Sequence, residues 1–350
     1  MNNNLSPNIL TAREHLRTLK SLQSSTGLFL ASPKDVSTGY DKAWLRDNFY
    51  TSLAFEEAGD WEIVKKLWRS ILDIFLKHED KIDWAIQHRP HESWQYVHAR
   101  YNPETFEEYW EEWGNKQNDA VGAILFNLGK LVHLKNKIDL NEKDKQMMQK
   151  LVDYLYALQY WEDPDSGIWE EGEEIHASSV GAVLAGLYQV KDLNFITVSE
   201  DMIQNGRNCL DKLLPRESES KFNDLALLSL IYPFNVVQRD QAQQIVDNVE
   251  YYFTRERGII RYKNDRYYNK NSDGYSEEAE WTIGLSWLSI IYALWGNTSK
   301  ANIYLKKAKK IITKDGKIPE LYFANENKFN DNIPLAWAES LFVVALLKSN

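Results

Sequence analysis

The sequence has 350 residues, of which 43% are hydrophobic and 26% charged, and this composition is typical of a globular protein with a large core. The net charge of −10 and the lack of a lysine- or arginine-rich block argue against a nucleic acid partner, because phosphate binding requires basic side chains. No apolar run approaches the ~20 residues that span a bilayer, the polar N-terminus lacks a signal-peptide pattern, and Cys209 is the single cysteine. We therefore expect a cytoplasmic protein without membrane insertion and without an internal disulfide.

Apolar periodicity along the chain predicts helices almost throughout. We expect twelve of them, at residues 7–22, 43–57, 60–77, 117–133, 141–161, 176–190, 197–214, 222–231, 238–253, 279–294, 298–311 and 333–348. The segment 259–268 is the one stretch that also fits a short hairpin.

The connections between these helices alternate in length. Short ones, such as 58–60 and 295–297, follow the second, sixth, eighth and tenth helices, with a somewhat longer one after the fourth. The long ones lie near 23–42, 78–116, 162–175, 215–221, 254–278 and 312–332. Alternate connections of antiparallel helices lie at opposite ends, so all long loops should share one face.

Six helical hairpins with long loops at one end predict an all-α fold, an (α/α)6 toroid closed around a central axis. We expect a single domain over residues 1–350, in which residues 1–37 contain the first helix and a long loop. The alternative is an open α-solenoid, although the chain has no sustained repeat of the tetratricopeptide or HEAT type.

The chain is rich in aromatic residues, with 13 Trp and 19 Tyr. Trp and Tyr fill cores, but they also form the flat, partly polar platforms that pack on sugar rings. Trp68, Trp287 and Trp295 lie within helical apolar patterns and are predicted to be core residues. Seven others adjoin irregular segments and are expected to face a cleft: Trp44, Trp84, Trp94, Trp113, Trp169, Trp281 and Trp337.

Two acidic motifs each set one carboxylate in an aromatic-rich stretch before an apolar helix. In GIWEEGEEIHASS, Glu170 follows Trp169, and in GKIPELYFANENKFNDNIPLAWAES, Glu320 precedes Leu321. Glycosidases need such a pair, one carboxyl as acid and one as base. Burial beside Trp169 would disfavour the charged form of Glu170 and raise its pKa, as an acid requires.

Other polar residues allow plainer interpretations. Glu173 and Glu174 fit a solvated turn, and His176 fits either a cap of the next helix or a substrate contact. His88 and His91 are separated by Pro90, which breaks the helical geometry that would aim both at one metal ion. We therefore expect no metal site and no cofactor.

Seven blocks in order along the chain resemble glycoside hydrolase family 15, the glucoamylase-like (α/α)6 barrels, and also the barrel region of phosphorylase kinase α and β subunits. The blocks are WLRDNFY at 44–50, VHARYNPETFEEYWEEWGNKQNDAVGAIL at 97–125, GIWEEGEEIHASSVGA at 167–182, FNDLALLSLIYPF at 222–234, RYKNDRYYN at 261–269, EEAEWTIGLSWL at 277–288, and IPELYF with PLAWAESL at 318–323 and 334–341. The resemblance covers roughly residues 38–348.

This resemblance implies roles for individual residues. Glu170 matches the general acid of the family and Glu320 the general base, with Glu171 as a substrate contact. Matches to residues that hold the terminal glucose, line the pocket or lie near it are Tyr40, Trp44, Arg46, Asp47, Trp113, Gln117, Asp119, Trp169 and Trp337. The motifs add His176, Trp281 and Tyr322 as candidate substrate contacts. Read without the resemblance, the Arg46/Asp47 pair fits either hydrogen bonds to sugar hydroxyls or a salt bridge at a helix start.

The predicted function is that of an inverting, exo-acting α-glucoside hydrolase. Its partner would be an oligosaccharide or α-glucan, and it would release glucose from a short α-glucan or an α-linked disaccharide. An inverting mechanism predicts carboxyl groups about 6.5–9.5 Å apart. The alternative is a non-catalytic carbohydrate-binding or regulatory protein, because the phosphorylase kinase subunits share most blocks and are regulatory. The sequence specifies neither the glycosidic linkage nor the oligomeric state.

Overall fold

The computed structural model describes residues 6–349 except 112, 135–136, 269–276 and 325, so parts of three expected long loops lie outside the described residues. An inner ring consists of α2 (Leu45–Ala58), α5 (Asn118–His133), α7 (Ala177–Val190), the 3-10 helix η2 (Leu225–Leu230), α10 (Ile283–Leu294) and α12 (Ala336–Lys348). Each inner helix contacts the next, and α12 returns to α2, so the ring is closed. This closure excludes the open solenoid.

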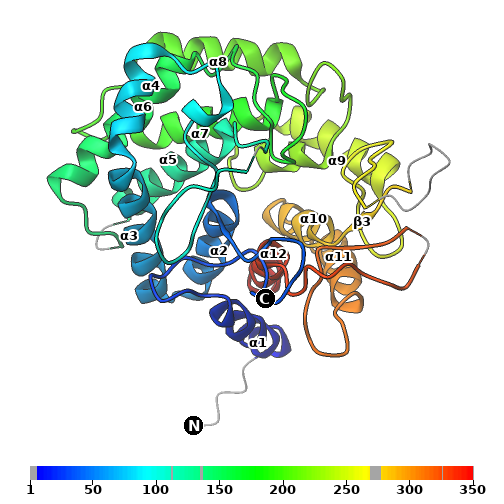
Figure 1. Ribbon diagram of the computed structural model, residues 1–350. Coiled ribbons are helices and arrows are strands. Elements are labelled where there is room, and N and C mark those ends of the chain that lie inside the picture. Colours follow the sequence, from blue (N-terminus) through cyan, green and yellow to red (C-terminus); the bar gives the residue numbers. More distant parts are fainter. Residues whose placement is uncertain (1–5, 112, 135–136, 269–276, 325, 350) are drawn as a thin grey trace.

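A second layer of helices surrounds this ring (Figure 1). It consists of α1 (Pro7–Ser21), α3 (Trp61–Lys77), α6 (Glu142–Leu158), α8 (Glu200–Leu213), α9 (Arg239–Phe253) and α11 (Thr298–Lys310). Each outer helix precedes an inner one in the chain and contacts the inner ring. The predicted (α/α)6 toroid is confirmed.

The two layers differ in sequence because they differ in burial. Helix α10, IGLSWLSIIYAL, has buried residues on all sides from Ile283 to Tyr292, whereas α8 buries only Met202, Gly206 and Leu210. A helix that is apolar all round belongs inside, and an amphipathic one belongs at the surface.

Helices α5 and α7 approach closely because glycines lie at their contact. A Cβ atom on Gly122 would lie 2.5 Å from the backbone nitrogen of Val183, and one on Gly186 would lie 2.6 Å from the carbonyl oxygen of Gly122. Larger side chains would therefore separate the two helices.

Three elements differ from the sequence-based expectation. The segment 222–231 forms the short 3-10 helix η2, capped by Asp224 and unable to continue through Pro233. The long connection 78–116 contains α4 (Glu79–His88) and a short 3-10 helix, η1 (Ser93–Gln95). Within 259–268, Ile259 pairs with Thr254 and Trp281 rather than with a residue of its own segment. Uniformly apolar sequence cannot distinguish helix types, which explains the first difference.

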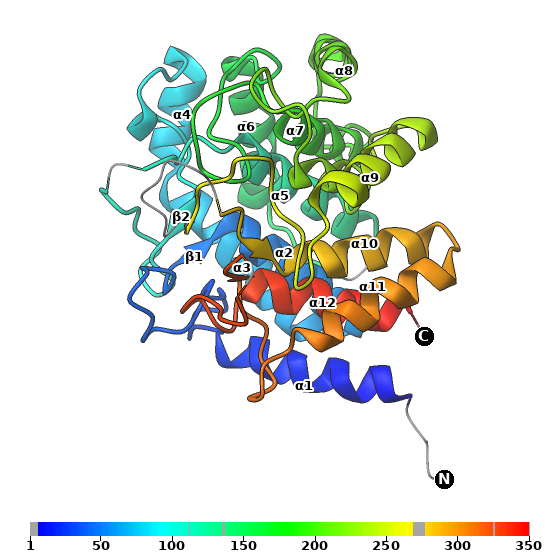
Figure 2. The same ribbon diagram turned by 90° about the vertical axis from the view of Figure 1, so that its right-hand side faces the viewer.

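The long connections gather at one end of the ring, as expected (Figure 2). Two short antiparallel ladders join them: β1 (Ala43–Trp44) pairs with β2 (Arg100–Tyr101), and β3 (Glu280–Trp281) pairs with β4 (Leu321–Tyr322). Each ladder links loops of different hairpins and fixes the residues at the starts of α2 and α10. In the described part of the chain, no helix combines the length and the apolar character needed to cross a membrane.

Candidate active site

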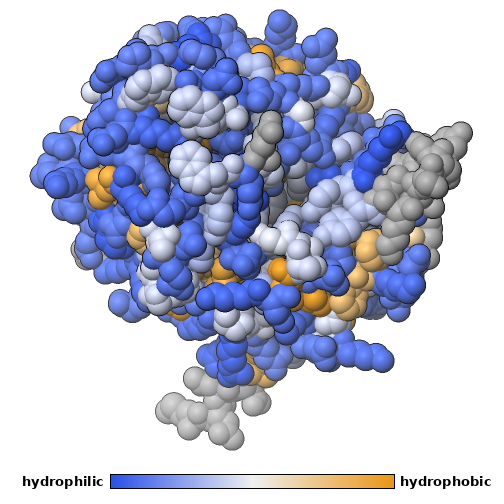
Figure 3. Space-filling view, viewed as in Figure 1, coloured by the Kyte–Doolittle hydropathy of each residue, from blue (hydrophilic) through white to orange (hydrophobic). Residues whose placement is uncertain are grey.

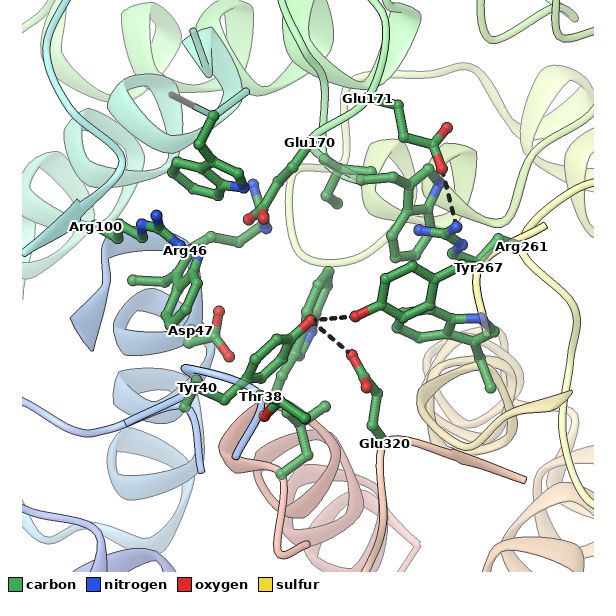
Figure 4. Close-up of a pocket in the computed structure, with 18 residues that line it drawn as sticks. Thr38, Tyr40, Arg46, Asp47, Arg100, Glu170, Glu171, Arg261, Tyr267 and Glu320 are labelled. Atoms are coloured by element: carbon green, nitrogen blue, oxygen red, sulfur yellow. Dashed lines mark hydrogen bonds and ion pairs between the residues drawn. The ribbon is translucent and has the colours of Figure 1, made fainter. Parts of the chain in front are cut away.

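A cavity of about 360 Å³ opens among the long connections, at the N-terminal ends of the inner helices. Figure 3 shows this face as mostly hydrophilic, with a hollow near the middle of the view. Seven aromatic side chains form much of the wall: Tyr40, Trp44, Trp113, Trp169, Tyr267, Trp281 and Trp337. Two glutamates, Glu170 and Glu320, lie on opposite sides of the cavity (Figure 4).

Glu170 is held in an unusual backbone conformation directly before the segment that leads into α7. Its φ of 63° lies in the left-handed region, which costs energy for a residue with a side chain and is often found at functional sites. The neighbouring chain approaches through Gly114, where a Cβ atom would lie 2.8 Å from the carbonyl oxygen of Glu170. Burial raises the pKa of the Glu170 carboxyl to about 7, although Arg46 acts in the opposite direction.

Arg46 links the acidic groups on this side of the cavity. Its Nη2 donates to Glu170 Oε1 at 2.7 Å, and its Nη1 donates to Gln117 Oε1 at 2.7 Å and to Asp119 Oδ2 at 3.1 Å. Gln117 and Asp119 therefore hold the Arg46 side chain in position and do not line the cavity themselves. Asp47 does line the cavity, and burial raises the pKa of its carboxyl to about 6 against the effect of Arg46.

Glu320 lies in a pocket of hydrogen-bond donors. Asn332 Nδ2 donates to its Oε2 at 2.8 Å and Asn330 Nδ2 donates to the same oxygen, while the Tyr40 hydroxyl donates to Oε1 at 3.1 Å. Burial raises the pKa of Glu320, and these three donors oppose that shift because they favour the ionised carboxylate. A carboxylate kept ionised by such donors is available to accept a proton.

Glu171 is occupied by protein partners. It accepts from Arg261 Nη2 at 2.9 Å, from the Tyr262 hydroxyl at 2.7 Å and from Lys221 Nζ at 2.6 Å. Burial alone would raise the pKa of Glu171, but Arg261 and Lys221 bring it below its ordinary value. Arg261 also pairs with Asp265. Glu171 is therefore an ionised anchor at the cavity wall.

Packing among the aromatic residues fixes the shape of the wall. The Trp169 ring stacks on Trp337 at 6.0 Å between centroids, and its Nε1 donates to Asp224 at 2.7 Å. The Trp44 ring contacts Trp113 edge to face at 6.0 Å. Rings held in this way give a rigid surface for a sugar ring to lie against.

Of the sequence-predicted site residues, the cavity brings together Tyr40, Trp44, Arg46, Asp47, Trp113, Trp169, Glu170, Glu171, Trp281, Glu320 and Trp337. His176 lies outside it, because its ring pairs with Asp165 at 2.9 Å at the start of α7. Tyr322 also lies outside, because its hydroxyl donates to the carbonyl oxygen of Ile311 at 2.9 Å. Gln117 and Asp119 lie behind Arg46, as described above.

The tryptophan expectations are met in part. Trp68 and Trp287 are fully buried, whereas Trp295 is only half-buried. Trp84 and Trp94 line a separate groove rather than the cavity.

Several residues of the site were not identified from the sequence. The cavity lining includes Thr38, Arg100, Arg261 and Tyr267, and Asn330 and Asn332 bind Glu320. The RYKNDRYYN block contains Arg261 and Tyr267, and the segment after Glu320 contains both asparagines. These motifs are visible in the sequence, but the directions in which their side chains point follow only from the fold. Among the described residues, no group of three His, Cys, Asp or Glu side chains is placed to hold a metal ion.

Residues 10–350 match the family model of glycosyl hydrolases family 15. The chain belongs to this family. Among solved structures, it is similar to a glycosidase variant with a glutamate-to-alanine substitution in complex with glucose, with a TM-score of 0.82 and 20% identity over 99% of both chains. A bacterial glucoamylase complexed with acarbose has a TM-score of 0.73 and 14% identity over 97% of this chain and 55% of that one. These neighbours support the toroid fold.

Relatives of this family 15 protein include regulatory subunits as well as an uncharacterized glycosyl hydrolase. The chain is 27% identical to the phosphorylase b kinase regulatory subunit alpha, skeletal muscle isoform, of Oryctolagus cuniculus over 92% of this chain, and it spans 31% of that subunit's length. It is 25% identical to an uncharacterized glycosyl hydrolase of Methanocaldococcus jannaschii over 96% of this chain and 55% of that protein.

Proposed function

We propose that this protein is an inverting, exo-acting α-glucoside hydrolase that releases glucose from a short α-glucan or an α-linked disaccharide. The observation that carries the proposal is one cavity with two glutamates in different surroundings, Glu170 partly buried and Glu320 buried. Glu170 has a pKa raised to about 7 by burial, so it holds a proton under mildly acidic conditions. Glu320 is surrounded by donors that favour its ionised form.

The reaction follows from this difference. Glu170 donates its proton to the glycosidic oxygen as the bond from that oxygen to the anomeric carbon breaks. A water molecule attacks the anomeric carbon from the opposite face, and Glu320 takes the proton that this water loses. Glu170 ends ionised and Glu320 ends protonated. The guanidinium of Arg46, 2.7 Å from Glu170 Oε1, stabilises the carboxylate that forms there.

Sugar recognition falls to the remaining wall. Arg46 and Asp47 both line the cavity and offer donors and acceptors to vicinal hydroxyls, and the tryptophans offer flat apolar faces. A cavity lined in this way accommodates a terminal sugar, and this favours an exo-acting enzyme. The glucose bound to the structurally similar glycosidase is consistent with a carbohydrate ligand.

A second candidate is a carbohydrate-binding regulatory protein without catalysis. It is favoured by the 27% identity to a phosphorylase b kinase regulatory subunit. Both candidates use the same cavity for a glucan, and they differ only in whether the bond is cut.

The experiment is to incubate the protein with maltose, isomaltose, trehalose and soluble starch and to measure released glucose. The variants Glu170→Gln and Glu320→Gln should each lose at least about a hundredfold in rate, since each loses one proton transfer. Proton NMR should detect β-glucose as the first product. Unchanged release by both variants would refute the proposal, and tight binding without release by wild type would support the regulatory candidate.

A further inference from the structure

A groove with a positively charged lining lies between the end of α11 and the connection that follows α9. It encloses about 540 Å³. Among the described residues, its charged lining consists of one carboxylate, Glu256, and four cations: Arg255, Arg257, Lys307 and Lys310. The net charge of the chain is −10, so this basic groove differs in sign from the protein as a whole.

Three of the four cations have N–H groups that no protein carboxylate occupies closely. Arg257 Nη2 lies 3.5 Å from Glu256 Oε2, and its Nη1 lies 3.8 Å from Glu280 Oε1, which is longer than a good hydrogen bond. In the described part of the chain, no carboxylate lies within 4.0 Å of Lys307 or Lys310. The basic groove therefore presents hydrogen-bond donors that a ligand can take.

Arg255 is already occupied and shapes the wall. Its Nη2 donates to Glu278 Oε2 at 2.8 Å, and its Nη1 donates to the carbonyl oxygens of Tyr252 at 3.0 Å and Thr254 at 3.1 Å. Because Glu278 compensates this charge, an incoming anion would depend on the other three cations.

A plainer explanation accounts for only half of the cluster. Lysines in the last turn of a helix favour its negative end, and Lys307 and Lys310 lie in the last turn of α11. Arg255 and Arg257, however, lie in the connection after α9, outside any helix. Stabilisation of the end of α11 does not require two arginines from another segment.

The apolar part of the lining strengthens attraction to an anion. Ile311 and Tyr322 both line the groove and are buried. The Tyr322 hydroxyl is occupied, because it donates to the carbonyl oxygen of Ile311 at 2.9 Å. Buried apolar groups beside a charge lower the local dielectric, and charges then attract each other more strongly than in water. The volume of the groove is that of a site for a small molecule, which falls in the range of about 300–1,000 Å³.

We propose that the basic groove binds a small anion that carries a phosphate group, either free in solution or as the headgroup of a lipid. The planar guanidinium of Arg257 binds two phosphate oxygens with paired N–H groups, and Lys307 and Lys310 neutralise the remaining charge. The groove shares no lining residue with the active-site cavity, so the inference does not depend on the proposed hydrolase function.

A bound anion would connect the end of α11 to the ladder of β3 and β4. Tyr322 of the groove lies on β4, which begins directly after Glu320. The backbone nitrogen of Arg257 donates to Glu280 of β3, and Glu280 pairs with Tyr322. Binding should therefore stabilise this part of the loop region.

The test is isothermal titration calorimetry of the whole protein with pyrophosphate at low ionic strength, because salt screens such charges. Wild type should bind pyrophosphate, and Lys307→Gln/Lys310→Gln should weaken this binding at least about tenfold. The matched control is Lys306→Gln/Lys309→Gln, which removes the same charge from the same helix at exposed lysines outside the groove. The control should bind within about twofold of wild type.

Vesicles distinguish the two sources of the phosphate group. The second assay is flotation of the protein with phosphatidylcholine vesicles that contain phosphatidic acid. Recovery that Lys307→Gln/Lys310→Gln abolishes and the control retains would support a lipid headgroup, and pyrophosphate binding without recovery would support a free compound. An equal loss in the control would reduce the effect to net charge and overturn the site, as would a wild type that binds neither probe.

Discussion

Substitution of Asn330 by alanine removes one of the three donors around the Glu320 carboxylate. The Asn330 amide lies 2.5 Å from Glu320 Oε2, where Glu320 is only 2% exposed. A hydrogen bond to a charged group contributes about 1.5–3 kcal/mol, and one pKa unit corresponds to about 1.4 kcal/mol. The substitution should therefore raise the pKa of Glu320 by about 1–2 units.

The sign of the effect on activity follows from the proposed role of Glu320 as a base. Only the ionised form of Glu320 can take a proton from water. A higher pKa of Glu320 therefore lowers the activity at acidic pH. The acidic limb of the profile of kcat/KM against pH should move to higher pH by about 1–2 units. The alkaline limb, assigned to Glu170, should stay in place.

The assay is the initial rate of glucose release across the acidic and neutral range, with circular dichroism and a melting temperature for each variant. Asn327→Ala is the matched control, because Asn327 lies in the same loop and is exposed. An acidic limb that does not move in a folded Asn330→Ala protein would show that Glu320 is not the base, and a shift of the alkaline limb alone would point to the same error.

Three further predictions concern other parts of the site and the ring. The alkaline limb of kcat/KM should lie near pH 7, since Glu170 must be protonated, and Arg46→Gln should move it to higher pH because Arg46 lowers the pKa of Glu170; a limb that moves down would contradict this. Gly114→Ala should reduce glucose release about tenfold or more, because the added Cβ meets the Glu170 carbonyl oxygen at 2.8 Å, and unchanged kinetics would show that this approach is unimportant. His15→Ala should lower the free energy of unfolding in urea by about 1–3 kcal/mol, because the buried Glu339 carboxyl loses a hydrogen-bond partner; an unchanged free energy of unfolding would refute the pairing argument.

The ring could be predicted from the sequence because the features that specify it are local ones. An apolar period, short turns after every second helix and long loops between them specify which helices pair and at which end the loops lie. Glu170 and Glu320 could be found for a similar reason, since each sits in a short motif with an aromatic neighbour. The short 3-10 helix at Leu225–Leu230 could not be distinguished from an α-helix, because its sequence is apolar at almost every position.

The roles of the supporting residues could not be predicted from the sequence, because these roles depend on where the side chains point. Gln117 and Asp119 precede or begin an inner helix, as do true lining residues, but their side chains bind Arg46. Tyr322 follows Glu320 by two positions and turns to the carbonyl oxygen of Ile311. Arg261 lies in the connection between α9 and α10, 90 residues after Glu171, and only the fold brings the two side chains together.

The ring closes where α12 meets α1 and α2, and no peptide bond crosses this seam. His15 of α1 pairs with Glu339 of α12 there, and Glu339 also accepts from the backbone nitrogen of Ile318, two residues before Glu320. A small separation of α1 from α12 would therefore reach the loop that carries Glu320. The rate of glucose release should therefore fall as soon as α1 separates from α12. On heating or in mild denaturant, this loss of rate should precede the loss of helical content.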